Sequence, residues 1–338
     1  MRRNGRRLFF RVIVVLILAA VCRPSAPAPA ADRLVGIYSA RVMSQSLPWI
    51  AQEAGLFKKH NLDFQLVFVA SSAFVTAAML GGDAEISLLG GIGIVRAFVQ
   101  GATDLAFIAG VKNVMTQSII ARPEIKRVED LKGKKIAVSR VGGNTHYFSV
   151  QVLRRYGMDA AKDVTFIQTG GEFEALAAFA NRAVDAATMT PPADYQAVSQ
   201  GGHRLAYGPE LGIPYAATIF AARRSVIAKK PKVIGNFVRA MAEASKILHT
   251  DKEFAYKVLG KELRVNDRKI LDAAYNAEIT ALERRLDIKT ESLQAILDEV
   301  SQIDPRAKKV KPQDLVDRRY LDDMEQGGFF NKLWGERR

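Results

Sequence analysis

The sequence is poor in the residues that most often carry catalysis or bind metals. It contains one cysteine, Cys22, among 338 residues, and its four histidines lack the spacing of metal ligands. A disulfide within the chain is therefore excluded, and if the first thirty residues are cleaved off, no thiol remains for a metal centre. The motifs G-x-S-x-G, H-E-x-x-H and G-x-x-x-x-G-K-[ST] are also missing. We therefore assign no catalytic residue and expect no metal and no cofactor.

Acidic residues are scarcer than basic ones, 35 Asp and Glu against 49 Lys and Arg, which gives a formal net charge of +14. Six of the arginines lie within residues 1–30, which contain no acidic residue, so +8 remains on the rest of the chain. There, both signs of charge are mixed along predicted helices, without a basic run or interleaved aromatic residues. This distribution argues against a nucleic-acid partner.

Residues 1–30 have the pattern of an export signal. Arginines between positions 2 and 11 precede an apolar segment over residues 12–21, and Ala28-Pro29-Ala30 is typical of a cleavage site. The apolar segment is too short to span a bilayer, which takes about 20 residues. We predict a signal peptide cleaved after Ala30 and a periplasmic location.

Two alternatives for the export signal stay open. The stretch Arg6-Arg7-Leu8-Phe9-Phe10 also fits a twin-arginine signal, which would mean export after folding. Cys22 directly follows the apolar segment, as in lipid-anchored proteins, although Val21 stands where such proteins have a small residue.

Short apolar segments alternate with amphipathic ones over most of the chain after residue 31, which is typical of an α/β fold with a mainly parallel sheet. The predicted strands cover residues 34–40, 64–70, 85–89, 105–111, 135–139, 164–168 and 186–190. The predicted helices among them cover residues 48–60, 73–80, 92–100, 145–156 and 172–180.

The alternation starts again after Pro123, and a helix-turn-Asp-strand pattern at residues 77–86 recurs at 177–186. We therefore expect two doubly wound lobes of like construction. From residue 225 onward the pattern is helical, with helices predicted over residues 231–248, 253–259, 267–286, 291–301 and 313–325. This helical C-terminal region is expected to cover one lobe.

The residues that follow the predicted strands are mostly small and able to form hydrogen bonds, and ligands of open α/β sheets bind at such strand ends. The turn before Thr145 is the most informative, because unpaired N–H groups at a helix start can hold an anion. The same turn can also be interpreted as a structural Gly-Gly turn in which Asn144 caps its own helix. The ligand-binding candidates from the strand ends are Ser39, Arg41, Ser72, Gly90, Gly91, Arg140, Gly143, Asn144, Thr145, Gln168 and Thr190.

Two aromatic residues near strand ends are further candidates. Trp49 either forms the floor of a ligand cleft or packs under the first strand, and Tyr195 has the same two interpretations at a later helix. The phenylalanines at positions 64, 68, 107 and 179 are predicted to lie in the core.

Four segments, at residues 49–68, 77–86, 128–138 and 314–329, resemble the periplasmic substrate-binding proteins of ABC importers. The subgroup is that of the sulfonate, taurine and nitrate binders and the thiamine-pyrimidine-precursor binders. The resemblance implies a type II periplasmic binding protein fold, in which two crossing segments join two α/β lobes and the ligand lies in the cleft between them. The resemblance implies ligand contacts at Gly143 and Thr145, near residues 39–43 and near residues 190–195. The segment at residues 39–43 adds Met43 to the ligand-binding candidates.

The resemblance further implies how the chain is divided and with what it interacts. We expect one lobe over residues 31–120 plus 218–338, another over residues 121–217, and hinges near residues 119–123 and 213–220. The protein would be a monomer that closes over a small, anionic solute and delivers it to an inner-membrane ABC permease with its ATPase. The solute would be a sulfonate, a carboxylate, a nitrate-like ion or a pyrimidine precursor.

Two alternatives stay open. One is an enzyme of pyrimidine-precursor synthesis or a lyase on the same fold, although the cysteine-rich motif of the family's fungal enzymes has no counterpart here. The other is a ligand-sensing protein that presents its closed form to a membrane receptor.

Overall fold

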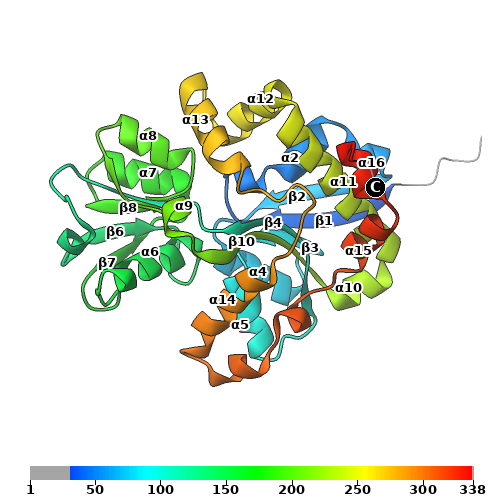
Figure 1. Cartoon of the computed structure of the whole chain (residues 1–338), viewed down its shortest axis with the longest axis horizontal. Helices are drawn as coiled ribbons and strands as arrows, with labels where there is room; N and C mark the ends of the chain where they lie inside the picture. Colours follow the sequence, from blue (N-terminus) through cyan, green and yellow to red (C-terminus); the bar gives the residue numbers. More distant parts are fainter. Residues whose placement is uncertain (1–30, 337–338) are drawn as a thin grey trace, which may run out of the picture. The chain divides into compact units, whose positions relative to one another are not determined.

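The computed structural model describes residues 31–336, and the predicted signal peptide and Cys22 lie outside these residues. The first of two five-stranded sheets has the order β2-β1-β3-β10-β4 (Figure 1). Strand β1 runs parallel to β3, whereas β10 runs antiparallel to both of its neighbours. The bounds are β1 Asp32–Tyr38, β2 Leu62–Phe68, β3 Ile86–Leu89, β4 Leu105–Val114 and β10 Pro214–Arg223.

The second sheet repeats this arrangement with the order β7-β6-β8-β5-β9. Strand β6 runs parallel to β7 and β8, and β5 runs antiparallel to β8 and β9. The bounds are β5 Ser118–Ala121, β6 Lys135–Val138, β7 Thr165–Gln168, β8 Ala186–Met189 and β9 His203–Tyr207. The expectation of a mainly parallel sheet therefore holds except for one antiparallel strand in each sheet, β10 or β5. Each sheet is mixed because it takes in an antiparallel strand, β10 or β5, directly beside the segment that connects it to the other sheet.

Helices alternate with the strands as predicted, and the chain after β10 is helical. Those before β10 are α2 Leu47–Glu53, α3 Leu56–Lys59, α4 Ser72–Gly81, α5 Ile92–Val99, α6 Asn144–Arg155, α7 Glu172–Ala180, α8 Ala193–Ser199 and α9 Gly208–Leu211. Those after it are α10 Arg224–Lys229, α11 Pro231–Thr250, α12 Lys252–Leu263, α13 Arg268–Ile279, α14 Thr290–Ser301, α15 Arg319–Gln326 and α16 Phe329–Trp334. Short 3-10 helices lie at Met43–Gln45, Val128–Leu131, Pro305–Lys309 and Pro312–Leu315.

Most predicted elements are confirmed within a few residues, and the differences have local causes. The helix predicted over residues 48–60 is two helices, because Gly55 adopts a left-handed conformation with φ 68° between them. The helix predicted over residues 267–286 ends at Ile279, and the one predicted from residue 313 begins at Arg319. Strands β5 and β9 were not predicted.

The core around the first sheet is built from the apolar faces of the C-terminal helices. Helix α11 presents Ile234, Phe237 and Met241, all fully buried, at the spacing of one helix face. The Phe237 ring lies 5.1 Å from that of Phe64 and 5.4 Å from that of Phe220 on β10, so helix and sheet interlock through aromatic contacts. Among residues 31–336, no helix is long and apolar enough to cross a membrane.

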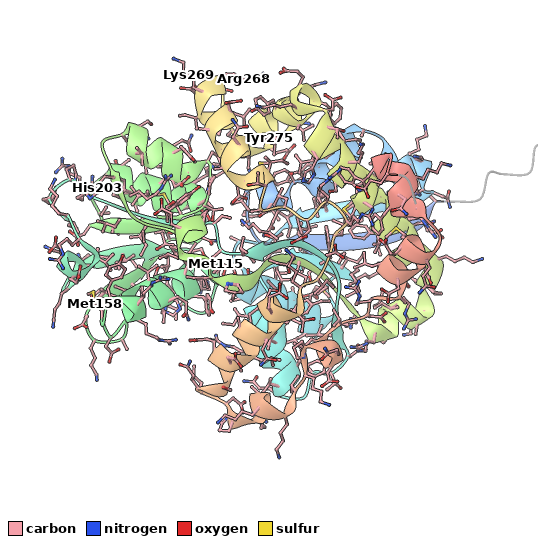
Figure 2. The ribbon with its side chains drawn as sticks, viewed as in Figure 1. Met115, Met158, His203, Arg268, Lys269 and Tyr275 are labelled. Carbon is pink, nitrogen blue, oxygen red and sulfur yellow. The ribbon has the colours of Figure 1, made fainter. Side chains whose placement is uncertain are left out.

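Two segments connect the sheets, one between β4 and β5 and one between β9 and β10. They are hydrogen-bonded to each other, since Gly208 N donates to Gln117 O at 2.8 Å and Met115 N donates to Ile213 O at 3.2 Å. Met115, which Figure 2 labels, lies on the first segment. It is completely buried. The chain thus passes from one sheet to the other a few residues before the predicted lobe boundaries at 120/121 and 217/218.

Candidate functional site

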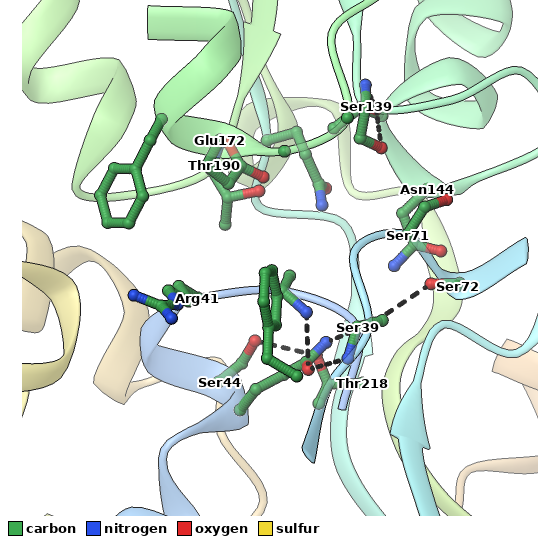
Figure 3. Close-up of a pocket in the computed structure, with 18 of the residues that line it drawn as sticks. Ser39, Arg41, Ser44, Ser71, Ser72, Ser139, Asn144, Glu172, Thr190 and Thr218 are labelled. Carbon is green, nitrogen blue, oxygen red and sulfur yellow. Dashed lines mark hydrogen bonds between the residues drawn. The ribbon is translucent and has the colours of Figure 1, made fainter. Parts of the chain in front are cut away.

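A cavity of about 200 Å³ lies among the loops that follow the strands of both sheets. Eight hydroxyl side chains line it, together with a small number of charged groups. The hydroxyls are those of Ser39, Ser44, Ser71, Ser72, Ser139, Thr145, Thr190 and Thr218. In Figure 3, Ser39, Arg41 and Ser44 lie on one side of the cavity, and Glu172 and Thr190 lie on the other.

The loop after β1 is held in place by the side chain of Gln45. Its Oε1 accepts hydrogen bonds from the backbone N–H groups of Ser39 and Ala40, at 2.9 and 3.0 Å, and its Nε2 donates to Ser39 Oγ at 2.8 Å. Gly90 N in turn donates to Ser72 Oγ at 3.1 Å. These bonds fix the positions of buried hydroxyls, which favours a rigid binding surface.

Ser71 marks a strained point on the same wall. Its φ is 78°, in a region that side-chain-bearing residues rarely adopt, while its Oγ accepts a hydrogen bond from Ala73 N at the start of α4. Backbone strain of this kind costs about 1–3 kcal/mol and is concentrated at functional sites. Further along the wall, the hydroxyls of Ser44 and Thr218 lie 2.8 Å apart and connect the loop after β1 to β10.

The opposite wall is formed by loops of the second sheet. Thr145 Oγ1 accepts a hydrogen bond from Ser139 N at 2.9 Å and lies 2.9 Å from Ser139 Oγ, so it closes the turn between β6 and α6. The backbone of Gly170 and Gly171 completes this wall where β7 leads into α7. Because glycines lack side chains, they leave room for a ligand near the N-terminus of α7.

Asn144 connects the two walls at the edge of the cavity. Its Nδ2 donates to Ala217 O at 2.8 Å, and its Oδ1 accepts a hydrogen bond from Tyr215 OH at 3.1 Å. A Cβ atom at Gly90 would lie 1.8 Å from Asn144 Oδ1, which explains the glycine at that position. The alternative interpretation, in which Asn144 caps its own helix, was wrong, because α6 has no side-chain cap and Asn144 reaches β10 instead.

Charged side chains of both signs reach the cavity. The guanidinium of Arg41 lies 5.0 Å from the centre of the Phe68 ring, and its buried Nε has no hydrogen-bond partner among the described residues. Arg264, just after α12, lies 5.9 Å from the Phe173 ring. Both guanidinium groups are therefore placed by aromatic contacts, which leaves donors available to an anion.

Lys112 is a cation whose charge is already matched. It is 1 % exposed, and its Nζ donates to Glu278 Oε1 at 3.0 Å and to Thr116 Oγ1 at 2.6 Å. Glu278 lies on α13 and is fully buried. This ion pair ties α13 to β4 behind the cavity, so we regard Lys112 as structural.

Glu172 is a carboxylate without such a partner. It begins α7, is partly buried, and accepts a hydrogen bond from Thr190 N at 3.0 Å. Burial raises the pKa of Glu172 to about 7, and the hydrogen bond from Thr190 opposes only part of that shift. No lysine or arginine among residues 31–336 lies within ion-pairing distance of it.

Six of the predicted site residues line the cavity, and the other eight lie elsewhere. Ser39, Arg41, Ser72, Asn144, Thr145 and Thr190 line it. Met43 and Trp49 belong to the core, where the rings of Trp49 and Tyr38 are nearly perpendicular with their centroids 5.6 Å apart. Tyr195 lies under Arg204, at 5.1 Å. The interpretation of Trp49 as a packing residue is the one that the structure supports.

The remaining five predicted site residues form backbone hydrogen bonds, precede a helix, or make side-chain contacts outside the cavity. Gly90 and Gly91 donate backbone N–H groups to Ser72 and Ala216, and Gly143 precedes α6. Arg140 stacks on Phe74 at 3.9 Å, and Gln168 Oε1 accepts from Val141 N at 3.1 Å.

Sequence patterns missed several lining residues, of which Phe68 is the clearest error. Phe68 was predicted to lie in the core, but it is 38 % exposed and lines the cavity, because it ends the edge strand β2. Glu172 begins the helix that follows the strand end at Gln168, which was a candidate, so a nearby signal was present. Lys112 and Arg264 are brought in from distant elements, for which the sequence holds no local signal.

A larger cavity, of about 560 Å³, lies between α5, α6 and α14. Its lining is mostly apolar and includes Val141 and Ile303, two of the most exposed large hydrophobic residues. Beside it, Arg154 on α6 forms an ion pair with Glu299 on α14 at 2.9 Å. Within residues 31–336, no cluster of His, Cys, Asp and Glu is arranged to hold a metal ion.

Two mixed sheets with flanking helices define the α/β fold of periplasmic binding proteins. A structure of a Bordetella bronchiseptica protein matches with a TM-score of 0.79 at 19 % identity, over 90 % of this chain and 98 % of that one. The alkanesulfonate-binding protein SsuA from Xanthomonas axonopodis, bound to MOPS, matches with a TM-score of 0.71 at 20 % identity, over 87 % and 100 %. The desulfurization enzyme DszB matches with a TM-score of 0.65 at 13 % identity, over 88 % and 99 %.

A family model described as NMT1/THI5 like matches residues 47–255, and the chain belongs to this family. A putative binding protein of Brucella abortus is 26 % identical over 248 residues, which are 71 % of this chain and 75 % of the relative. The taurine-binding periplasmic protein of Escherichia coli is 25 % identical over 177 residues, which are 52 % of this chain and 54 % of the relative. These matches confirm the resemblance that the sequence predicts.

Proposed function

We propose that the chain is an exported solute-binding protein that holds a small anionic solute in the cavity of about 200 Å³. The observation that carries the proposal is the convergence of eight hydroxyls and the unpaired Arg41 where strands of both sheets end. Hydroxyls and a guanidinium are the donors that sulfonates, carboxylates and nitrate accept. The names of the relatives, a taurine binder and an alkanesulfonate binder, support the same class of solute.

The solute would be released to an inner-membrane ABC permease with its ATPase after capture by closure of two lobes. The lobes would comprise residues 31–120 plus 218–338 and residues 121–217, with the connecting segments as hinges. Contacts that run between elements of the two sheets support a closed arrangement, namely the Asn144 bonds to β10 and the Arg154–Glu299 ion pair. We further propose a monomer, located in the periplasm after removal of residues 1–30.

A thermal-shift experiment with purified protein tests the binding role. The panel consists of nitrate, propanesulfonate, butanoate and an aminopyrimidine. A solute present at 100 times its dissociation constant stabilises the protein by about 2.7 kcal/mol. Stabilisation by at least one anion that saturates with concentration is the expected result. A panel without any such response, repeated at several pH values, would overturn the proposal.

An enzymatic function is the second candidate, because the desulfurization enzyme DszB has the same fold. Incubation of the protein with each solute that binds, followed by detection of sulfite or another product, distinguishes the two. Recovery of the solute unchanged supports binding without turnover. A ligand-sensing role is tested separately, since only a transport component should stimulate the ATPase of a reconstituted ABC permease.

A further inference from the structure

Glu172 is the one carboxylate of the second-sheet wall that combines partial burial with the lack of a cationic partner among residues 31–336. Its side chain lines the cavity from the first turn of α7 (Figure 3). Thr190 N is its backbone donor, at 3.0 Å. One neutral donor does not balance the charge of a carboxylate held out of water.

The charged groups around Glu172 do not supply the missing cation. Arg264 also lines the cavity, 5.9 Å from the ring of the neighbouring Phe173, but it forms no ion pair with Glu172. Asp194 on α8 is fully buried, and its Oδ2 accepts hydrogen bonds from Arg204 at 2.9 Å and from Ser118 at 2.8 Å. Lys112 on β4 is committed to Glu278. Glu174, on α7 itself, adds another negative charge at the cavity.

The facing wall has the opposite imbalance. Arg41 lines the cavity from the loop after β1, and no carboxylate among the described residues lies within ion-pairing distance of it. The cavity therefore presents a guanidinium on one wall and a carboxylate on the other, and the two are not paired with each other. A solute with a negative end and a positive end would neutralise both walls, whereas a purely anionic solute would leave Glu172 unmatched.

We propose, on the basis of the proposed function, that the solute carries a protonated amino group beside its anionic group and that Glu172 selects this amino group. The anionic end is held by Arg41 and the hydroxyls of the first-sheet wall. The ammonium donates to Glu172 from within the cavity. Glu172 is thus the specificity-determining residue of the site.

Matched pairs of probes test this proposal by titration calorimetry. The pairs are propanesulfonate against 3-aminopropanesulfonate and butanoate against 4-aminobutanoate. Because a hydrogen bond to a charged group contributes about 1.5–3 kcal/mol, we expect the amino member of a pair to bind at least about tenfold more tightly. Glu172→Gln should remove that preference, and Glu210→Gln, an exposed acid in the first turn of α9, should retain it.

A pH series adds a second measurement. Burial raises the pKa of Glu172 to about 7, so the affinity for the amino probes should increase as the pH rises towards that value and beyond it. This increase should be absent in Glu172→Gln. Glu172→Asp, which keeps the charge, should retain part of the preference, and melting curves of each variant identify a loss of folding.

The outcomes separate the two proposals. If plain anions bind and the amino members show no gain in the unmodified protein, the role of Glu172 is refuted while the binding function stands. If no member of either pair binds but nitrate does, the role of Glu172 is refuted and the binding function stands. If nitrate and the aminopyrimidine also fail to bind, the proposed function fails and the role of Glu172 fails with it. A preference for amino probes that persists in Glu172→Gln also refutes the assignment.

Discussion

Replacing Gly90 by alanine tests how the two walls of the cavity are connected. The new Cβ would lie 1.8 Å from Asn144 Oδ1, so the Asn144 side chain would have to move away. Its bonds to Ala217 O and from Tyr215 OH would then be lost. Each of these hydrogen bonds contributes about 0.5–1.5 kcal/mol to the free energy of unfolding. Alanine also restricts the unfolded chain more than glycine does, which offsets about 0.4–1 kcal/mol of that loss. We expect a net loss of stability of about 1–2 kcal/mol.

Urea denaturation of a double-mutant cycle measures this connection. Asn144→Ala alone should destabilise by about 1–3 kcal/mol, and adding Gly90→Ala should then cost nothing further, since the obstructing amide is gone. Gly81→Ala is the control, because a Cβ there would make an ordinary contact 3.5 Å from Asp83 Oδ2. Additive effects of the Gly90 and Asn144 substitutions, or a neutral Gly90→Ala, would refute the reasoning.

Three further predictions concern charged residues. Arg41→Ala should weaken propanesulfonate binding by about tenfold or more in calorimetry. Arg140→Ala removes a guanidinium outside the cavity and should leave the affinity unchanged. Equal losses of affinity in the two variants would contradict the assigned site. Lys112→Met should destabilise by about 3–5 kcal/mol in denaturant, because it leaves Glu278 buried without its partner. A cost below about 1 kcal/mol would contradict the structural role of this ion pair. Burial raises the pKa of Glu172 from 4.5 to about 7, so folding favours its protonated form. The free energy of unfolding without ligand should therefore decline between about pH 4.5 and 7 more steeply than in Glu172→Gln; parallel pH profiles would refute this.

The alternation of strands and helices was predictable because each short apolar segment is bounded by turn residues and followed by an amphipathic one. The pairing of strands was not. Residues 213–220 were expected as a hinge, yet most of them belong to β10, which lies between β3 and β4. Nothing local in an extended apolar segment indicates which sheet it joins or in which direction it runs.

The candidate site could be predicted only where it consists of strand ends. Ser39, Ser72 and Thr145 follow or face predicted strands, and all three line the cavity. Arg264 comes from the end of α12, far along the chain, and Phe68 faces the cavity because β2 is an edge strand. Arg41 and Arg140 occupy equivalent places in the sequence pattern, but only Arg41 lines the cavity, since Arg140 turns to Phe74.

The position of β10 also determines when the first sheet can form during synthesis. Its neighbours β3 and β4 are complete at residue 114, but the strand that joins them ends only at Arg223. Until a ribosome has released that segment, β3 and β4 have no common partner, and the backbone groups that would face β10 stay in water. The nascent first half therefore remains open, and residues 31–120 produced alone should not assemble this sheet.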